Sequence, residues 1–290
     1  MQAVAEVRVL VPGDEAQLFA FLGPHLDTSL FFFSNIERAG LLDRGEAYQA
    51  TYVACFNAAG AITAVAGHSW NGNVMLQGDE GLERAALHAV SRSGRAVKGL
   101  VGPWSLACRA RKALDLEQAP AVHDQKELLF TLSLDQLQLP ALLSQSNVAF
   151  RAPTEAEAVD VLGPWRADYM VECLGTRRTP ELAETSREQM RGWCKAGTFW
   201  LLTDANEIVA MTGFNAETRG VCQIGGVFTP PALRGRGYAR VAVAGSLLLA
   251  KKERGATRSV LFTAETNLAA CRAYSALGYQ IVGDFGLIFL

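Results

Sequence analysis

An apolar stretch that runs directly into two closely spaced glycines restricts the fold of this chain more than any other feature. Residues 221–229 form the pattern of a strand, and Gly235 and Gly237 then open a helix. The first turn of a helix leaves about four backbone N–H groups unpaired, and the peptide dipoles add about half a positive charge there. Glycine has no Cβ and adopts positive φ, so a ligand can approach the main chain closely. The sequence therefore predicts an anion site, with Arg234 and Arg236 as additional cationic donors.

The same residues exclude two common phosphate-binding loops. A dinucleotide-binding Gly-x-Gly-x-x-Gly loop needs a third glycine at position 240, which is Arg240, and a Walker loop needs Gly-Lys-Ser/Thr, which is absent. The spacing Arg234-x-x-Gly237-x-Ala239 instead resembles the (Gln/Arg)-x-x-Gly-x-(Gly/Ala) pyrophosphate loop of the GNAT N-acetyltransferase superfamily. This resemblance implies that the loop holds acetyl-CoA as a cosubstrate. An isolated Arg-Gly-Arg-Gly is more often a surface turn, so the context matters.

That context is a second motif downstream. Residues 259–263 form the pattern of a buried strand, and Asn267 is expected to cap a helix that ends at Gly278. Asn267 and Tyr274 share one helical stripe with Ala270, Cys271 and Leu277, and lie about 10 Å apart along the axis. The pattern Asn267-x-x-Ala270-x-x-x-Tyr274-x-x-x-Gly278-Tyr279 also resembles the GNAT C-terminal motif. Taken alone, the Asn and the Tyr are each more often structural.

The resemblance implies a set of site residues. Tyr274 is the expected general acid, because the family tyrosine lies near the thioester sulfur and can protonate the leaving thiolate. The Asn of the motif contacts the cofactor arm, and backbone N–H groups near Val227 polarise the thioester carbonyl. The expected cofactor contacts are Val227, Phe228, Thr229, Arg234, Gly235, Arg236, Gly237, Tyr238, Ala239, Arg240 and Asn267. No metal site is expected.

The general base cannot be assigned from the sequence. All four histidines, His25, His68, His88 and His123, lie in the first half of the chain. The strand before the glycine loop offers Cys222 and Gln223 where some relatives have Glu or Asp. Glu265, Glu217 and Glu172 are candidates, although each is more often a solvated surface charge. A chain of water molecules would serve equally.

The two halves of the chain follow one plan. The first half contains strand patterns at residues 7–10, 48–56, 61–69, 74–76 and 97–101, with helices at 14–22 and 82–90. The second half contains a similar order, with strand patterns at 148–151, 198–203, 208–215 and 221–229 and with helices from Thr154 and over 181–195. The segment Cys108-Arg109-Ala110-Arg111-Lys112-Ala113-Leu114 agrees with Cys271-Arg272-Ala273-Tyr274-Ser275-Ala276-Leu277 at five of seven positions. We interpret this agreement as a degenerate internal repeat.

We therefore predict an α/β (α+β) fold with two GNAT-like domains, each a mixed, mostly antiparallel central sheet flanked by helices. Residues 1–145 form a degenerate domain without a pyrophosphate loop, with 127–134 as its last strand. Residues 146–290 form the catalytic domain that binds acetyl-CoA. The first copy is not expected to transfer acetyl groups, since it lacks the loop and has Arg111 at the position of Tyr274. The ending at residues 278–285 resembles the glycine N-acyltransferase-like branch, which also places a degenerate domain before the working one.

Composition sets further limits. The net charge of −2 gives no global electrostatic case for nucleic acid, and the six cysteines lack the close pairs of a zinc or dithiol site. No signal peptide is recognisable, and the longest apolar segment, residues 241–250, is too short to span a membrane. We expect a cytoplasmic enzyme with no nucleic-acid or membrane partner; a homodimer is compatible with these features.

The expected reaction is transfer of an acetyl (acyl) group from acetyl-CoA to a primary amine of a small molecule, amino acid or peptide, by direct attack. Two alternatives from other classes stay open. A non-catalytic acyl-CoA-binding regulatory module would keep the loop but need no general acid. A tRNA-dependent aminoacyl transferase with paired GNAT-like domains would need a basic groove and have little use for the loop.

Overall fold

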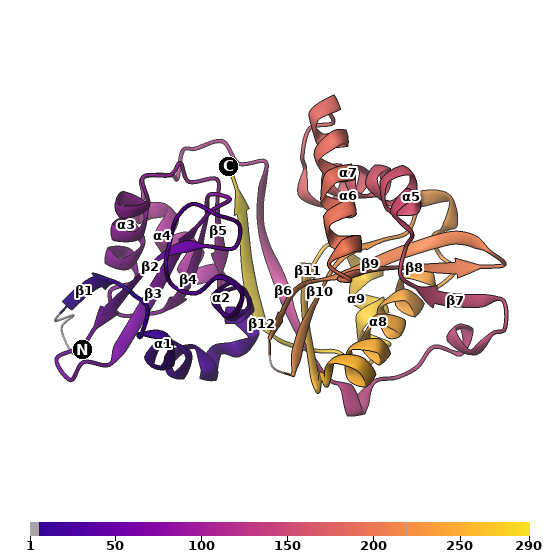
Figure 1. Ribbon diagram of the computed structural model, residues 1–290, viewed down its shortest axis with the longest axis horizontal. Coiled ribbons are helices and arrows are strands. Elements are labelled where there is room, and N and C mark those ends of the chain that lie inside the picture. The colour runs from indigo at the N-terminus through magenta and orange to yellow at the C-terminus, as the bar shows by residue number, and fades with distance from the viewer. Residues whose placement is uncertain (1–5, 219) are drawn as a thin grey trace. The chain divides into compact units, whose positions relative to one another are not determined.

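The computed structural model of the chain describes residues 6–218 and 220–290 and divides into two compact units (Figure 1). The first unit comprises Met1–Leu128 together with Gly283–Leu290, and the second comprises Leu129–Val282. In each unit, a mixed and mostly antiparallel sheet is flanked by helices. The predicted fold class is therefore confirmed.

The sheet of the first unit has the strand order β1-β2-β3-β4-β5-β12, where β12 is Gln280–Phe289, and only the β4 and β5 pair is parallel. The elements of this unit up to α4 are β1 (Glu6–Val9), α1 (Glu15–Leu22), α2 (Leu26–Ala39), β2 (Ala50–Phe56), β3 (Ile62–Ser69), β4 (Asn73–Gly78), α3 (Leu82–Ser93), β5 (Gly99–Gly102) and α4 (Trp104–Ala113).

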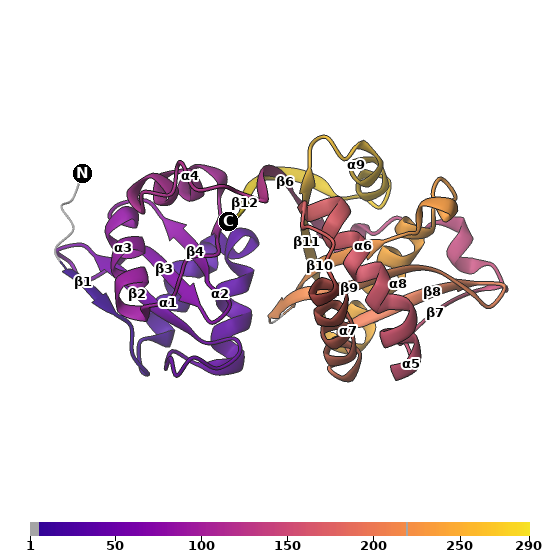
Figure 2. The ribbon, with the colours of Figure 1, turned by 90° about the horizontal axis from the view of Figure 1, so that it is seen from above.

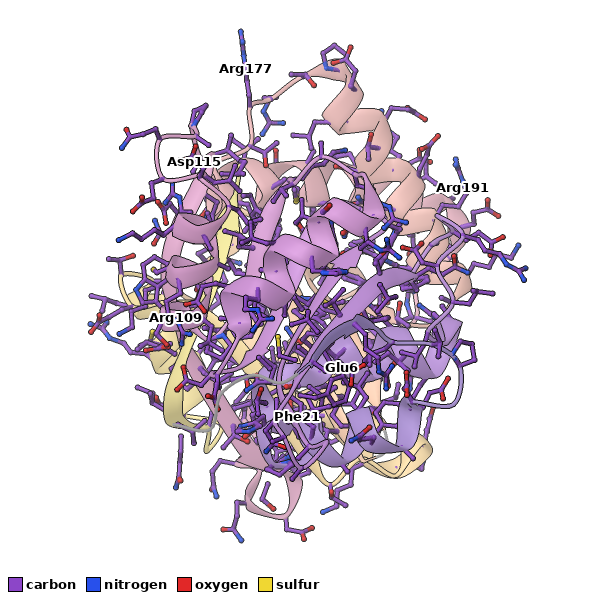
Figure 3. The ribbon with its side chains drawn as sticks, turned by 90° about the vertical axis from the view of Figure 1, so that its left-hand side faces the viewer. Glu6, Phe21, Arg109, Asp115, Arg177 and Arg191 are labelled. Carbon is purple, nitrogen blue, oxygen red and sulfur yellow. The ribbon has the colours of Figure 1, made fainter. Side chains whose placement is uncertain are left out.

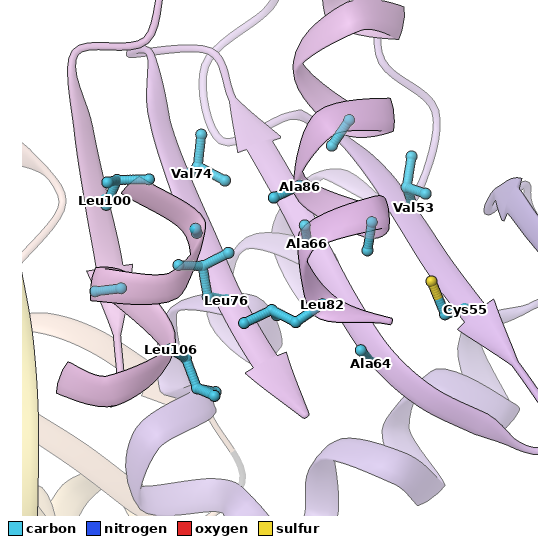
Figure 4. Packing of buried hydrophobic residues seen from close by; sticks show 14 of the residues in the cluster. Val53, Cys55, Ala64, Ala66, Val74, Leu76, Leu82, Ala86, Leu100 and Leu106 are labelled. Atoms are coloured by element: carbon cyan, nitrogen blue, oxygen red, sulfur yellow. The ribbon is translucent and has the colours of Figure 1, made fainter. Parts of the chain in front are cut away.

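Helices α3 and α4 cover one face of this sheet, and α1 and α2 cover the other. Figure 4 shows the first of these contacts, in which Cys55, Ala64 and Leu76 of the strands pack against Leu82 of α3. Alternate residues of the same strands point to the opposite face. The Tyr52 ring of β2 therefore packs against the Phe32 ring of α2, with 6.1 Å between the ring centroids. This alternation is the period of two that the strand patterns predicted.

The sheet of the second unit has the order β6-β11-β10-β9-β8-β7, where β6 is His123–Ser133, and β10 and β11 are parallel. Its elements are β7 (Val148–Arg151), α5 (Glu155–Glu157), a π-helical turn (Ala158–Leu162), α6 (Gly163–Leu174), α7 (Pro180–Lys195), β8 (Phe199–Asp204), β9 (Glu207–Thr218), β10 (Val221–Phe228), α8 (Tyr238–Arg254), β11 (Arg258–Ala264) and α9 (Leu268–Ser275).

The helices α6 and α7 lie on one face of this sheet and α8 lies on the other (Figure 1). Leu201 and Met211 contribute to the core beneath α6 and α7. Their neighbours Leu202 and Ala210 pack with Val241 of α8. The glycine loop at the start of α8 and the helix pair α6 and α7 are thus held by the same strands.

Two long strands belong to both units: β6 (His123–Ser133) and β12 (Gln280–Phe289) are neighbours in the sheet order and lie side by side in Figure 2. Residues 129–133 of β6 belong to the second unit, and the following Leu134 N–H donates to Thr257 O at 2.8 Å. In return, Gly286–Phe289 of β12 pair with Gly99–Gly102 of β5 in the first unit.

The compact units therefore have different limits from the expected domains 1–145 and 146–290. The segment 127–134 was expected to be the last strand of the first copy, but its larger part lies in the sheet of the second unit. Likewise, the last residues of the chain complete the sheet of the first unit. The reason is that each half contributes one strand to the other, which a linear division of the sequence cannot express.

Two further details differ from the sequence analysis. The helix α2 was not predicted, although its buried residues Phe32 and Ile36 lie at helical spacing. The helix that begins after Asn267 ends at Ser275 and not at Gly278. Gly278 lies just beyond it with φ +98°, where a Cβ would stand 2.8 Å from the carbonyl oxygen of Gln136.

Candidate functional site

The glycine loop, residues 234–240, has the geometry of an anion-binding site. Gly235 and Gly237 have φ of +79° and +82°, so the predicted need for glycine is confirmed at both positions. A Cβ at Gly235 would meet no atom within 4 Å, and a Cβ at Gly237 would meet only Arg240 Nη2, at 3.9 Å. Residues 234–237 are exposed. The space beside the main chain is therefore open to a ligand.

The backbone donors of this loop are available. The N–H of Val241 is bonded to Gly237 O at 3.1 Å and closes the first turn of α8. The N–H groups of residues 235–240 have no acceptor among the residues that the structure describes. Consecutive unpaired N–H groups at a helix start form a site for phosphate oxygens.

The arginines of the loop have different roles. Arg234 donates through Nε to Thr229 O at 2.9 Å and through Nη2 to Glu172 at 2.7 Å, and the Glu172 bond raises the pKa of Arg234. It therefore ties the loop to α6. Arg240 is half-buried, and its Nε is shielded from solvent without a partner in the described part of the chain. A cationic donor left unpaired beside free N–H groups fits a bound phosphate.

Three other predicted cofactor residues have buried side chains that contact the protein itself. Tyr238 is buried, and its hydroxyl donates to Asp204 Oδ2 at 2.6 Å and also interacts with Arg236 of the loop. Phe228 is also buried, with its ring 6.2 Å from that of Trp165 in α6. Thr229 is buried, and its backbone oxygen accepts the bond from Arg234. Of the remaining positions, Arg236 is exposed and Ala239 is half-buried in the first turn of α8.

The strands before the loop separate, as the expected chemistry requires. The parallel register of β10 with β11 ends at Gln223 and Val260, although β10 continues to Phe228. On the other side, the register with β9 passes over Gly226 and Val227, and Gly226 has φ +60°. Val227 therefore lies where β10 is out of register with both neighbouring strands, which suits backbone groups that bind a thioester.

The second motif is confirmed in its local structure. The Asn267 side chain accepts a hydrogen bond from the N–H of Ala270 at 3.2 Å and so caps α9. Asn267 is exposed, whereas Tyr274 is buried, so the shared stripe runs from the surface inward. The Tyr274 ring packs edge-on against Phe130 and Tyr279, each with a centroid distance of 6.0 Å.

The candidate bases are not equivalent. Glu217 lies opposite Cys222 in the register, at the end of β10 far from the loop, and pairs with Arg254 at 2.5 Å. Its position removes it from the candidates. Glu172 lies beside the loop but is paired with Arg234, and Glu265 is exposed after β11. The structure therefore favours neither of the two remaining carboxylates as a base.

The first unit has a helix start in the corresponding position, but the residues around it differ. Gly81, with φ +89°, precedes α3 just as Gly237 precedes α8. However, the connection contains Asp79 and Glu80, and Arg109, labelled in Figure 3, bonds both Asp79 and Glu83. Carboxylates at a helix start oppose phosphate binding and satisfy the dipole themselves.

The strands of the first unit also stay close together. A Cβ at Gly102 of β5 would stand 2.7 Å from Leu76 O of β4. Arg111, at the position of Tyr274 in the repeat, pairs with Asp124 at 2.6 Å. That only the second copy binds a cosubstrate stays a prediction.

The second unit matches a known family. Residues 165–279 match the sequence model of the acetyltransferase (GNAT) family, a segment that contains both motifs. A search of curated proteins gave no match. The residues that the structure describes contain no helix able to span a membrane and no group of three or more metal-binding side chains.

Solved structures share the fold over nearly the whole chain. A Drosophila protein has a TM-score of 0.64 at 12% identity, covering 98% of this chain and 98% of its own. A GCN5-related N-acetyltransferase from Sphaerobacter thermophilus has 0.54 at 16%, covering 98% and 94%. A tandem GNAT protein from the clavulanic acid biosynthesis pathway has 0.51 at 12%, covering 98% and 97%. These similarities establish a fold shared with tandem GNAT proteins.

Proposed function

We propose that this protein is an acyl-CoA-dependent N-acyltransferase that moves an acetyl group from acetyl-CoA to a primary amine. The observation that carries the proposal is the run of N–H groups at residues 235–240 that have no acceptor in the described part of the chain. Positive-φ glycines lie in this run, and the Arg240 Nε beside them also has no partner among those residues. The family match over residues 165–279 points to the same chemistry. The likeness to the glycine N-acyltransferase-like branch rests on residues 278–285 alone.

The reaction is a direct transfer. The amine nitrogen forms a bond to the acetyl carbon, the carbonyl oxygen gains charge against backbone N–H groups near Val227, and the C–S bond then breaks. The electron pair leaves with the CoA sulfur, which takes a proton from Tyr274. The amine loses its surplus proton to water or to a carboxylate. The loop holds the pyrophosphate, and Asn267 holds the arm.

Replacing Gly237 tests the cofactor site directly. Gly237→Asp places a carboxylate and a Cβ where phosphate belongs, so acetyl-CoA binding should be lost. Positive φ costs a non-glycine residue about 1 kcal/mol, which the domain can tolerate. Gly255→Asp is the matched control, because Gly255 has φ +66° at the other end of the same helix and no atom within 4 Å of its Cβ.

Calorimetry with acetyl-CoA measures the outcome, and circular dichroism confirms that each variant is folded. We expect one site per chain in the wild type and in Gly255→Asp, and none in Gly237→Asp. Undiminished acetyl-CoA affinity in Gly237→Asp, or two equal acetyl-CoA sites in the wild type, would contradict the proposal.

A further inference from the structure

Gln223 of β10 is a buried carboxamide without a hydrogen-bond partner. Its side chain is 2% exposed, and its Nε2 is shielded from solvent and has no partner among the residues that the structure describes. Its neighbours in the sheet are Ala216 of β9 and Val260 of β11, whose side chains form no hydrogen bonds. A buried amide group that donates no hydrogen bond is unfavourable, and native proteins contain few of them.

The other buried carboxamides in the described part of the chain are bonded. Gln77 accepts hydrogen bonds from two hydroxyl groups of α2, and Gln49 accepts them from two backbone N–H groups shortly before it in the chain. Asn35 donates to a methionine sulfur. Gln223 is therefore the exception, and a bound molecule would supply the missing partner.

The side chain of Gln223 lies on the face of the sheet that α6 and α7 cover. Gly225 pairs with Gly213 of β9, where a Cβ would stand 2.1 Å from the ring of Phe199 in the core beneath these helices. Gly225 therefore lies on the same face as that core. Residues two apart in a strand share a face, so Gln223 belongs to it as well.

A second carboxamide lies beside Gln223. The register of β9 with β10 shifts after Gln223, which leaves Asn215 as an extra residue in β9. A Cβ at Gly225 would stand 2.1 to 2.2 Å from the end of the Asn215 side chain, so this side chain lies across the glycine. Bulges of this kind redirect side chains, often next to sites. Asn215 is exposed and Gly225 is half-buried. The space over Gly225 is thus occupied by the end of an exposed side chain and not by the packed core.

Both carboxamides lie on the strand that leads to the proposed acyl-transfer site. Gln223 is the last residue of β10 in register with β11, and Val227 follows four residues later. At about 3.3 Å per residue, Val227 is about 13 Å from Gln223 and about 7 Å from Gly225. Val227 is half-buried, as Gly225 is, so solvent reaches this part of the strand. An acceptor whose amine meets the thioester at Val227 can therefore extend past Asn215 toward Gln223.

We propose that Asn215 and Gln223 bind peptide groups of the acceptor, so that the acceptor amine is the N-terminus of a peptide. A carboxamide has an oxygen that accepts and an NH₂ group that donates, and these match the N–H and C=O of a peptide group. A carboxylate would leave the carboxamide oxygen without a donor, and an alkyl chain would leave both groups unpaired. At about 3.4 Å per extended residue, a tripeptide reaches from Val227 to both carboxamides.

The inference rests on the proposed function for the fate of the amine, but peptide binding can be tested by itself. Calorimetry on the full chain in saturating CoA is the first test. The probes are triglycinamide and its depsipeptide analogue, in which esters replace the two peptide bonds, so length and charge are the same. We expect saturable binding of triglycinamide, about 10-fold weaker in Gln223→Leu and in Asn215→Ala. The ester should bind the wild type about 10-fold more weakly than triglycinamide does, and should bind the variants about as well as the wild type.

Stability and kinetics separate this role from a structural one. Gln223→Leu removes an unpaired amide and keeps a similar volume, so the melting temperature should stay unchanged or rise, whereas a glutamine with a structural role would lower it. In thiol-release assays, Gln223→Leu should raise KM for triglycinamide with little change in kcat. Gln77→Leu is the matched control, since Gln77 is a buried glutamine of the first unit that has hydrogen-bond partners. It should lower the melting temperature and leave the affinity for triglycinamide unchanged.

Several results would overturn the inference. They are an absence of saturable triglycinamide binding in the wild type, equal affinity for the peptide and the ester, equal losses of affinity in Gln223→Leu and Gln77→Leu, or a lower melting temperature in Gln223→Leu. Asn215→Ala changes an exposed side chain and gives the same comparison if Gln223→Leu does not fold. Failure of the proposed function looks different, because acetyl-CoA then neither binds nor releases thiol with any amine, whatever triglycinamide does.

Discussion

At the scale of single residues, Tyr274 carries the most specific chemical prediction. Its ring is buried between Phe130 and Tyr279, and its helix begins at the capping residue Asn267. Tyr274→Phe keeps the ring and removes only the hydroxyl. If that hydroxyl protonates the departing thiolate, kcat should fall about 100-fold, the low end for general acid catalysis, with little change in acetyl-CoA affinity.

The neighbouring tyrosine supplies the control for this variant. The Tyr279 hydroxyl shares a buried hydrogen bond of 2.7 Å with Ser259, and burial raises the pKa of Tyr279 well above its ordinary value. Tyr279→Phe should therefore cost about 1 kcal/mol of stability and leave kcat unchanged. An unchanged kcat in Tyr274→Phe, measured where chemistry is shown to limit the rate, would make Tyr274 a packing residue.

At the scale of elements, the start of α5 links a cap to the pH dependence of stability. Thr154 and Glu157 form a capping box, and Glu157 also binds Arg151 at 2.6 and 2.8 Å. The Arg151 bonds lower the pKa of Glu157 from 4.5 to about 2. Because the pKa is lower in the folded state, the stabilisation is fully present above pH 4.5 and is lost as the pH falls toward 2.

Glu157→Gln should therefore reduce the free energy of unfolding by about 1 kcal/mol at pH 7, and the difference from wild type should shrink between pH 4.5 and 3. Urea unfolding at several pH values measures this difference. Glu155→Gln is the control, since Glu155 lies in the same short helix but is exposed. Its ion pair with Arg191 is also longer, at 3.5 Å. A difference that does not vary with pH would contradict the role of the carboxylate.

The sequence predicted those elements whose signals are local. The turn between β8 and β9 lies at Ala205 and Asn206, both with positive φ, and the helix expected from Thr154 begins there. Both glycines of the loop also have the predicted conformation.

At the scale of the whole molecule, each half contributes a strand to the sheet of the other, β6 in one direction and β12 in the other. This exchange of strands could not be predicted from the sequence. A buried strand has the same apolar pattern whichever sheet receives it. Leu129, Phe130 and Leu132 of β6 are buried in the second unit, and Ile288 of β12 is fully buried in the core of the first. The partner of such a strand depends on pairing between distant segments.

This exchange predicts how the chain can be divided. A fragment of residues 147–290 lacks the β6 residues that lie beside β11, and it keeps 283–290 without their partner β5. It should aggregate, because it exposes one sheet edge and carries an unpaired apolar strand. A fragment of residues 129–282 contains the complete second unit and should be soluble and bind acetyl-CoA. Size-exclusion chromatography and calorimetry on both fragments decide the matter. A monomeric fragment 147–290 with wild-type affinity for acetyl-CoA would show that the second unit does not need β6. Such a fragment could remain in solution only if its sheet is stable without the buried side chains of Leu129, Phe130 and Leu132.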